Sequence, residues 1–263
     1  MTTNELKQII LTTDLNQFIH GADVQQIGIG CSGDSVLKIS KDGNDFFLKY
    51  SANKNIETEY KKLNWLQGCL PVPQIISYQH ENGIHYLLTR GLDGEMICTP
   101  RYMKNWHSGL NVILQAFEKL WTTNIQDCSF DARLDYKLKQ IKVKIDSEQI
   151  KPEDIRPEFL EKYGSIDGIY EYLIKNKPAE QLCFSHGDTS LPNIFGHGDK
   201  LSGFIDVSDC GVGDIWFDIA VTAKSIKRNY NEEAVQIFYR EIKNKIGKIK
   251  HDIIDYYLTL VEL

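Results

Sequence analysis

The chain has 263 residues, a hydrophobic content of 42%, a charged content of 25% and a formal net charge of −6 at pH 7. These proportions are typical of a globular protein and argue against a disordered or fibrous chain. The acidic balance argues against nucleic acid as a partner, because phosphate groups require a basic surface, and it favours a cationic substrate.

No apolar run approaches the ~20 residues that cross a bilayer, and residues 1–10 lack the pattern of a signal peptide. The six cysteines include no Cys-x-x-Cys pair, which favours reduced thiols over disulfides or a zinc site. We therefore expect a cytoplasmic protein that binds no membrane. We expect a monomer, and the sequence leaves a dimer open.

The first motif is Gly-x-Gly-x-x-Gly at residues 28–33, which alone fits a dinucleotide fold, a kinase loop or an ordinary turn. A dinucleotide site requires a helix next, whereas two strand patterns within 36–49 flank a turn at 41–44. Glycines in a hairpin loop let backbone N–H groups approach phosphates, and Ser32 and Gly33 are the candidate contacts. Closure of a hairpin by small residues is an equal alternative for this loop taken alone.

Lys49 ends the second of these strands, and a helical pattern follows over residues 56–67. The 3.6-residue spacing puts Glu59 among three apolar residues on one helix face. These apolar residues are Ile56, Leu63 and Leu66. A buried carboxylate needs a cation, which makes Lys49 its natural partner. Kinases use such a strand lysine and helix glutamate to place phosphates, and a surface lysine with a rim glutamate is the alternative.

The apolar strand pattern at 86–89 leads into a glycine-containing segment, where we place a hinge. Backbone groups of Arg90 and Leu92 are candidates to hydrogen-bond an adenine edge, and Phe47 is a candidate to lie against the adenine ring. Residues 1–92 thus form the expected nucleotide-binding lobe.

Residues 93–263 are dominated by helical spacing. The predicted helices cover 106–124, 134–145, 166–176, 215–227, 232–246 and 249–260. Together with the strand-rich first part, they predict an α+β fold of two lobes. Residues 93–263 are the expected catalytic and substrate-binding lobe.

His186, Asp188, Asn193 and Asp206 have the spacing that protein kinases use for phosphoryl transfer. In kinases a histidine lies two residues before the catalytic aspartate, an asparagine lies five residues after it, and a later aspartate completes the metal site. Asp188 is therefore the candidate group that accepts the proton of a substrate hydroxyl. A tight turn followed by a strand-end cap is the alternative without catalysis.

Strand patterns on both sides of a turn at 198–199 predict a hairpin that brings Asn193 and Asp206 to one end. Their oxygen atoms are donors that suit Mg²⁺. We expect His186 to hold the loop rather than to act as a base. Asp218, near the start of a predicted helix, is expected to support the same loop.

Three groups of residues resemble one known family. They are residues 63–68 with 70–73, residues 184–188 with 193–195, and residues 202–206 with 218–220. The chain is similar, nearly end to end, to the aminoglycoside phosphotransferases, and within them to the 3'-phosphotransferases that inactivate kanamycin-type antibiotics.

The resemblance implies a protein-kinase-like fold of two lobes, a small β-rich lobe followed by a larger, mainly α-helical one. It also implies ATP or GTP as phosphate donor, two Mg²⁺ ions, and transfer of the γ-phosphoryl group to an aminoglycoside hydroxyl, which gives antibiotic resistance. The matching positions are Ser32, Lys49 and Glu59 at the nucleotide, Asp188 as the base, and Asn193 and Asp206 as metal ligands.

In that family, acids of the helical lobe and of the carboxyl end hold the ammonium groups of the antibiotic, since a polycation must exchange hydration for paired charge. The candidates here are Glu158, Glu161, Glu262 and the terminal carboxylate of Leu263. Ordinary exposed acids are the alternative interpretation of all four.

Two positions depart from the family pattern. The 3'-phosphotransferases usually carry Gly-Arg after the metal aspartate, where this chain has Ser208-Asp209, and Val261 replaces the first acid of a carboxy-terminal acidic pair. Both departures lie near substrate positions, so they bear on the antibiotic more than on the kinase chemistry. The alternatives are a kinase of choline, an amino-acid alcohol or a sugar, and a nucleotide-binding protein that has lost turnover.

Overall fold

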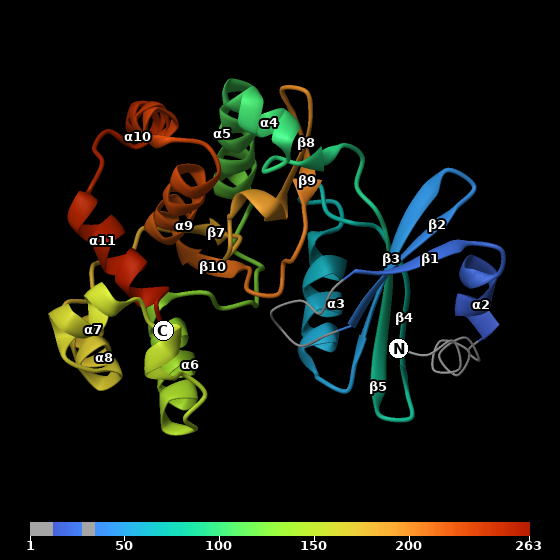
Figure 1. Ribbon diagram of the computed structural model, residues 1–263, viewed down its shortest axis with the longest axis horizontal. Helices are drawn as coiled ribbons and strands as arrows, with labels where there is room; N and C mark the ends of the chain where they lie inside the picture. Colours follow the sequence, from blue (N-terminus) through green and yellow to red (C-terminus); the bar gives the residue numbers. More distant parts are fainter. Residues whose placement is uncertain (1–12, 28–34) are drawn as a thin grey trace. The chain divides into compact units, whose positions relative to one another are not determined.

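The computed structural model describes residues 13–27 and 35–263, which form two compact units (Figure 1). The first unit comprises Met1–Asp93 and Gly203–Ser208, and the second comprises Gly94–Ser202 and Asp209–Leu263. The segment Gly203–Ser208, which the sequence analysis grouped with the second lobe, therefore packs within the first unit. The functional division at residue 92 stays a prediction.

The first unit is built on a five-stranded antiparallel sheet in the order β1-β2-β3-β5-β4. Its elements are α2 (Thr13–Ile19), β1 (Asp23–Ile27), β2 (Ser35–Lys41), β3 (Asn44–Ser51), α3 (Asn55–Leu66), β4 (Ile75–Glu81) and β5 (Ile84–Arg90). Asp42 and Gly43 form the two-residue turn between β2 and β3 with φ angles of 50° and 74°. Positive φ at both positions matches the twist of paired strands, so the predicted hairpin is confirmed.

The two faces of this sheet differ in what they bury. Alternate residues of β3, Phe46 and Leu48, join an apolar cluster that includes Leu15 of α2. The residues between and after them, Phe47 and Lys49, point to the opposite face because side chains alternate along a strand. That alternation directs Lys49 away from the apolar cluster.

The second unit is mainly helical. Its helices are α4 (Pro100–Lys104), α5 (Trp106–Thr122), α6 (Leu134–Asp146), α7 (Pro157–Tyr163), α8 (Ile166–Lys175), α9 (Ile215–Asn229), α10 (Glu232–Ile246) and α11 (His251–Leu260). Its short strands are β6 (Glu95–Met96), β7 (Leu182–Ser185), β8 (Ile194–His197), β10 (Gly211–Asp214) and the first part of β9 (Lys200–Phe204). The six helices predicted from apolar spacing are present, and α9 packs against both α10 and α11 (Figure 1). In residues 13–27 and 35–263, no helix combines the length and apolar character needed to cross a membrane.

Candidate functional site

Lys49 and Glu59 form an ion pair within the first unit. Lys49 Nζ donates to Glu59 Oε1 at 2.7 Å and to Oε2 at 2.9 Å. Glu59 is buried on the inner face of α3, together with the apolar residues that the helical spacing predicted. On the solvent side of the same helix, Lys61 pairs with Glu57 at 2.6 Å. Helix α3 thus carries Glu59 of an inward ion pair and both residues of an outward one.

Asp206 lies in the segment Gly203–Ser208 and approaches the same lysine. Its Oδ1 is 3.9 Å from Lys49 Nζ, and its side chain is 53% exposed. Two contacts hold the segment in the first unit: Phe204 N–H donates to Pro71 O at 2.9 Å, and Lys62 Nζ donates to Ser208 O at 2.6 Å. Asp206 also has a φ of 56°, a conformation that aspartate tolerates better than most residues. The first unit thereby presents a lysine ammonium and a solvent-accessible carboxylate side by side.

The predicted contacts with the phosphates and with adenine are only partly described. Ser32 and Gly33 lie outside the described residues. Arg90 N–H donates to Gln74 O at 2.9 Å, so this N–H is already used within the sheet. Phe47 is half-buried, and a Cβ on Gly91 would come within 3.0 Å of its ring. Leu92 is the residue after Gly91. The contacts of Phe47, Arg90 and Leu92 with adenine stay a prediction.

The loop that carries Asp188 begins at the end of a small sheet in the second unit. Strand β7 pairs antiparallel with β10, and Ser185 is the last residue of β7. Gly187 follows with a φ of 83°, and a Cβ there would overlap the carbonyl oxygen of Asp209. Only glycine meets both conditions without strain. The chain therefore turns sharply just before Asp188.

Replacing Gly187 by alanine is expected to lower the free energy of unfolding by about 2–4 kcal/mol, because it combines an unfavourable φ with a backbone overlap. Gly164→Ala is the matched control, since Gly164 has a φ of 82° and nothing within 4 Å of its Cβ position. The control should lose about 1–2 kcal/mol. Urea denaturation of both variants measures the difference, and equal losses would show that the overlap has no effect.

Asp188 and Asn193 contact each other directly. Asn193 Nδ2 donates to Asp188 Oδ2 at 2.8 Å and to Asp188 O at 3.1 Å. Ser190 N–H donates to Asp188 Oδ1 at 3.2 Å. Because the amide nitrogen of Asn193 faces Asp188, its carbonyl oxygen is the atom left to accept a hydrogen bond or bind a cation. The arrangement thus offers a half-buried carboxylate beside a hard oxygen donor.

Asp218 on α9 binds the start of this loop. Its carboxylate accepts hydrogen bonds from Ser185 Oγ at 3.1 Å, from His186 N–H at 3.2 Å and from Gly187 N–H at 3.3 Å. His186 is buried and accepts the Asp188 N–H at Nδ1, 3.3 Å away. These are the kinds of contact that a loop-holding role for His186 and Asp218 requires.

Burial raises the pKa of Asp218 to about 7, against the opposing effects of the Ser185 hydrogen bond, the Lys137 charge and the loop N–H groups. Between the ordinary pKa of aspartate, about 4, and about 7, the folded state binds a proton that the unfolded state has released. The contribution of Asp218 to the free energy of unfolding therefore falls as pH rises through this window. Urea denaturation of wild type and Asp218→Asn at about pH 5 and about pH 8 should show a larger loss for wild type. Parallel changes in the two proteins would contradict this assignment.

The four predicted acceptor-binding residues have different surroundings. Glu161 is exposed and Leu263 is half-buried. Glu158 is exposed and lies 3.4 Å from a guanidinium nitrogen of Arg156. The carboxylate of Glu262 is bound by two cations, Arg156 and Lys224. The sequence analysis singled out neither cation, since they lie 106 and 38 residues from Glu262 along the chain and no local pattern joins them.

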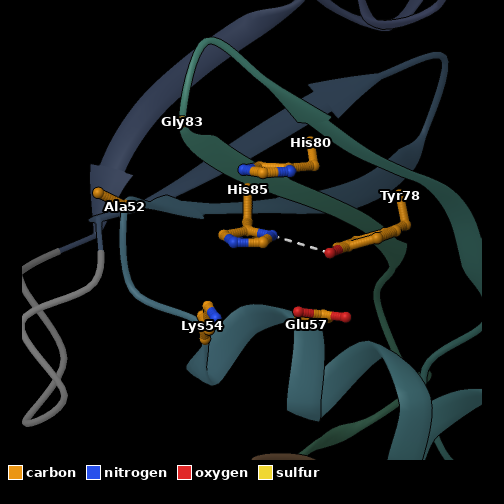
Figure 2. Close-up of a pocket in the computed structure, with 7 residues that line it drawn as sticks. All are labelled: Ala52, Lys54, Glu57, Tyr78, His80, Gly83 and His85. Atoms are coloured by element: carbon orange, nitrogen blue, oxygen red, sulfur yellow. Dashed lines mark hydrogen bonds between the residues drawn. The ribbon is translucent and has the colours of Figure 1, made fainter.

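A separate pocket of about 600 Å³ lies in the first unit, between the start of α3 and the β4–β5 hairpin (Figure 2). Its lining comprises Ala52, Lys54, Glu57, Tyr78, His80, Gly83 and His85. The rings of His80 and His85 stack with centroids 4.0 Å apart, and His85 Nδ1 shares a hydrogen bond of 2.8 Å with Tyr78 OH. The lining includes neither Lys49 nor Glu59, so the pocket is distinct from their ion pair.

Comparison with known proteins decides the family. A model of the phosphotransferase enzyme family, APH, matches residues 23–244. The chain belongs to this family. An aminoglycoside 3'-phosphotransferase of Niallia circulans is 30% identical over 239 residues, which cover 89% of this chain and 90% of the relative. One of Acinetobacter baumannii is 27% identical over 258 residues, covering 95% and 97%.

Solved structures of the same family share the fold. The aminoglycoside-3'-phosphotransferase of type VIII matches with a TM-score of 0.81 and 22% identity, covering 95% of this chain and 97% of that one. APH(3'')-Id of Streptomyces rimosus, in complex with ADP and streptomycin, matches with a TM-score of 0.75 and 19% identity, covering 98% of both chains. The family resemblance and the α+β fold predicted from the sequence are confirmed. This APH-family chain is an aminoglycoside-phosphotransferase-like kinase.

Proposed function

We propose that this kinase transfers the γ-phosphoryl group of ATP to a hydroxyl of a kanamycin- or neomycin-type aminoglycoside and so gives resistance in the cytoplasm. The contact between Asp188 and Asn193 carries the proposal, because it pairs a candidate base with a candidate metal ligand. Two further findings support it: relatives named aminoglycoside 3'-phosphotransferases, and family structures that bound ADP with streptomycin or AMP-PNP with hygromycin B. GTP is the alternative donor.

In this proposal, Lys49 binds the α- and β-phosphates and Glu59 keeps its ammonium in place. The candidates for the remaining nucleotide contacts are Ser32, Gly33, Phe47, Arg90 and Leu92. Asn193 and Asp206 would hold Mg²⁺, since an amide oxygen and a carboxylate are hard donors that leave room for water and phosphate oxygens. Among the described residues there is no cluster of three or more His, Cys, Asp or Glu side chains suited to a metal. A magnesium site formed by Asn193 and Asp206 does not require such a cluster, because water and phosphate oxygens complete the shell of the ion. When bound, the ion neutralises charge on the phosphates.

Asp188 acts on the acceptor. Its carboxylate orients the attacking hydroxyl and accepts its proton as the oxygen bonds to the γ-phosphorus and the bond to the bridging oxygen breaks. The Ser190 and Asn193 hydrogen bonds keep that carboxylate in place. Because Asp188 is half-buried, a substrate hydroxyl can reach it.

The proposal is tested by magnesium-dependent nucleotide consumption with kanamycin, neomycin, choline or no acceptor, each with ATP and with GTP. Turnover is expected with the two aminoglycosides and not without acceptor. Turnover with choline alone would instead make the chain a kinase of another small hydroxylated substrate. Nucleotide binding without turnover on any acceptor would overturn the proposal and identify a protein that has lost catalysis.

A further inference from the structure

We propose that Lys62 is a positioning residue for Asp206: its ammonium group ties the chain two residues after Asp206 to helix α3, and so fixes the carboxylate for Mg²⁺. The inference rests on the proposed function in one respect, which is that Asp206 binds the metal. It adds to the candidate metal site a residue that contacts no metal itself and that the sequence analysis did not single out.

Lys62 lies on the buried face of α3. It follows Glu59 by three residues, a spacing that puts both side chains on one side of a helix, and it is only 8% exposed. A buried ammonium group requires hydrogen-bond acceptors. Lys62 Nζ donates to the backbone oxygen of Ser208 at 2.6 Å, and a hydrogen bond with a charged donor is stronger than one between neutral groups. Lys62 therefore connects α3 firmly to the segment Gly203–Ser208.

Asp206 lies midway between two anchors. Phe204 N–H, two residues before it, donates to Pro71 O at 2.9 Å. Ser208 O, two residues after it, accepts the Lys62 hydrogen bond. Between the anchors Asp206 has a φ of 56°, a conformation that is unfavourable for residues other than glycine and persists where the surroundings enforce it. Loss of the second anchor would let the backbone at Asp206 relax and its carboxylate move.

Helix α3 holds Asp206 by two routes. In the first, Glu59 pairs with Lys49 at 2.7 Å, and Lys49 Nζ lies 3.9 Å from Asp206 Oδ1. That last contact is a longer attraction to a carboxylate that is 53% exposed, so water weakens it. In the second, Lys62 makes a shorter, partly buried hydrogen bond to Ser208 O. The Lys62 route is therefore the one that fixes where the aspartate lies relative to Lys49.

The geometry that Mg²⁺ requires makes this connection important. The ion demands a nearly ideal octahedral shell, so its affinity depends on how accurately each ligand is placed. Replacing a residue that orients a metal ligand commonly weakens metal binding roughly 10- to 100-fold. Phosphate binding by Lys49 depends on the Glu59 pair instead. Lys62 should therefore affect the metal and leave the metal-free nucleotide unaffected.

The test measures the Kd for Mn²⁺ from the electron paramagnetic resonance signal of the free ion, with saturating AMP-PNP and no acceptor. Lys62→Met keeps an unbranched side chain without a donor and is expected to raise this Kd about tenfold or more. Lys62→Arg, which can donate to the same carbonyl, should restore most of the affinity. Lys61→Met is the control, since Lys61 pairs with Glu57 on the solvent side and its loss should leave the Kd unchanged. Lys62→Leu is measured alongside, so that the comparison does not depend on a single variant folding.

The Kd for AMP-PNP without metal separates positioning from a general loss of structure. A positioning residue leaves this second constant close to the wild-type value, because the Lys49–Glu59 pair is intact. A raised Mn²⁺ Kd with an unchanged AMP-PNP Kd, reversed by Lys62→Arg, supports the inference. An unchanged Mn²⁺ Kd in Lys62→Met and Lys62→Leu would overturn it, as would an equal rise of both constants.

Asp206→Ala distinguishes this inference from the proposed function. If Asp206→Ala loses Mn²⁺ while Lys62→Met binds it like the wild type, the metal role of Asp206 stands and the positioning role of Lys62 falls alone. If Asp206→Ala binds Mn²⁺ as tightly as the wild type, the proposed metal site and the positioning role fall together. Neither result depends on which acceptor is phosphorylated.

Discussion

Asp188→Asn is expected to lower turnover by about 10²-fold or more while leaving nucleotide affinity nearly unchanged, because it removes a positioned base and keeps the shape of the side chain. Ser190 N–H donates to Oδ1 and Asn193 Nδ2 donates to Oδ2 of Asp188. An amide has a single acceptor oxygen, so Asp188→Asn keeps the volume of the side chain and one of these two hydrogen bonds. The effect should appear in kcat, since the lost interaction belongs to the step in which the hydroxyl attacks.

The measurement combines steady-state kinetics on the best acceptor with the Kd for ADP. Asp199→Asn is the matched control, since Asp199 is an exposed residue in the turn between β8 and β9 of the second unit. The control should keep wild-type turnover. An Asp188→Asn variant that retains more than about a tenth of the activity would remove Asp188 from the role of base.

Lys49→Met is expected to reduce kcat/KM on the order of 10²-fold, the usual effect of removing one preorganised group that stabilises developing charge. It should also lower the free energy of unfolding by about 1–3 kcal/mol, because the Glu59 carboxylate loses a charge-assisted partner while remaining buried. Lys61→Met provides the control, since Lys61 pairs with the solvent-side Glu57 and should change neither quantity appreciably.

A double variant separates the two effects of Lys49. Adding Glu59→Gln to Lys49→Met removes the buried charge, so stability should recover in part while activity stays low. Urea denaturation and kinetics on the same preparations report the two quantities. If activity recovered together with stability, Lys49 would be a structural residue and its proposed phosphate contact would be wrong.

Local patterns predicted much of the framework. The period of 3.6 residues over 56–67 located α3 and put Glu59 on its buried face, and the need of a buried carboxylate for a cation then pointed to Lys49. Asp42 and Gly43 specify a two-residue turn, so the β2–β3 hairpin was also predictable. Such features depend on residues close together in the chain, where spacing and turn chemistry act directly.

Local patterns missed the elements that are short or held from a distance. Strands β7 and β10 have four residues each, too few for a clear alternation, yet their pairing fixes the start of the Asp188 loop. Segment Gly203–Ser208 was assigned by sequence order to the second lobe, whereas its hydrogen bonds to Pro71 and Lys62 place it in the first unit.

By itself the sequence predicted the candidate kinase residues and identified the family, because both depend on short motifs whose residues lie close together in the chain. Only the tertiary structure decided which carboxylates are buried and which cations contact them. It showed that Glu262, one of four equivalent acids in the sequence, is buried between Arg156 and Lys224, and that Asp218 has a pKa raised to about 7 by complete burial. The neighbours of a carboxylate and its exposure to water depend on contacts between residues that lie far apart in the chain. Such contacts produce no periodic pattern in the sequence.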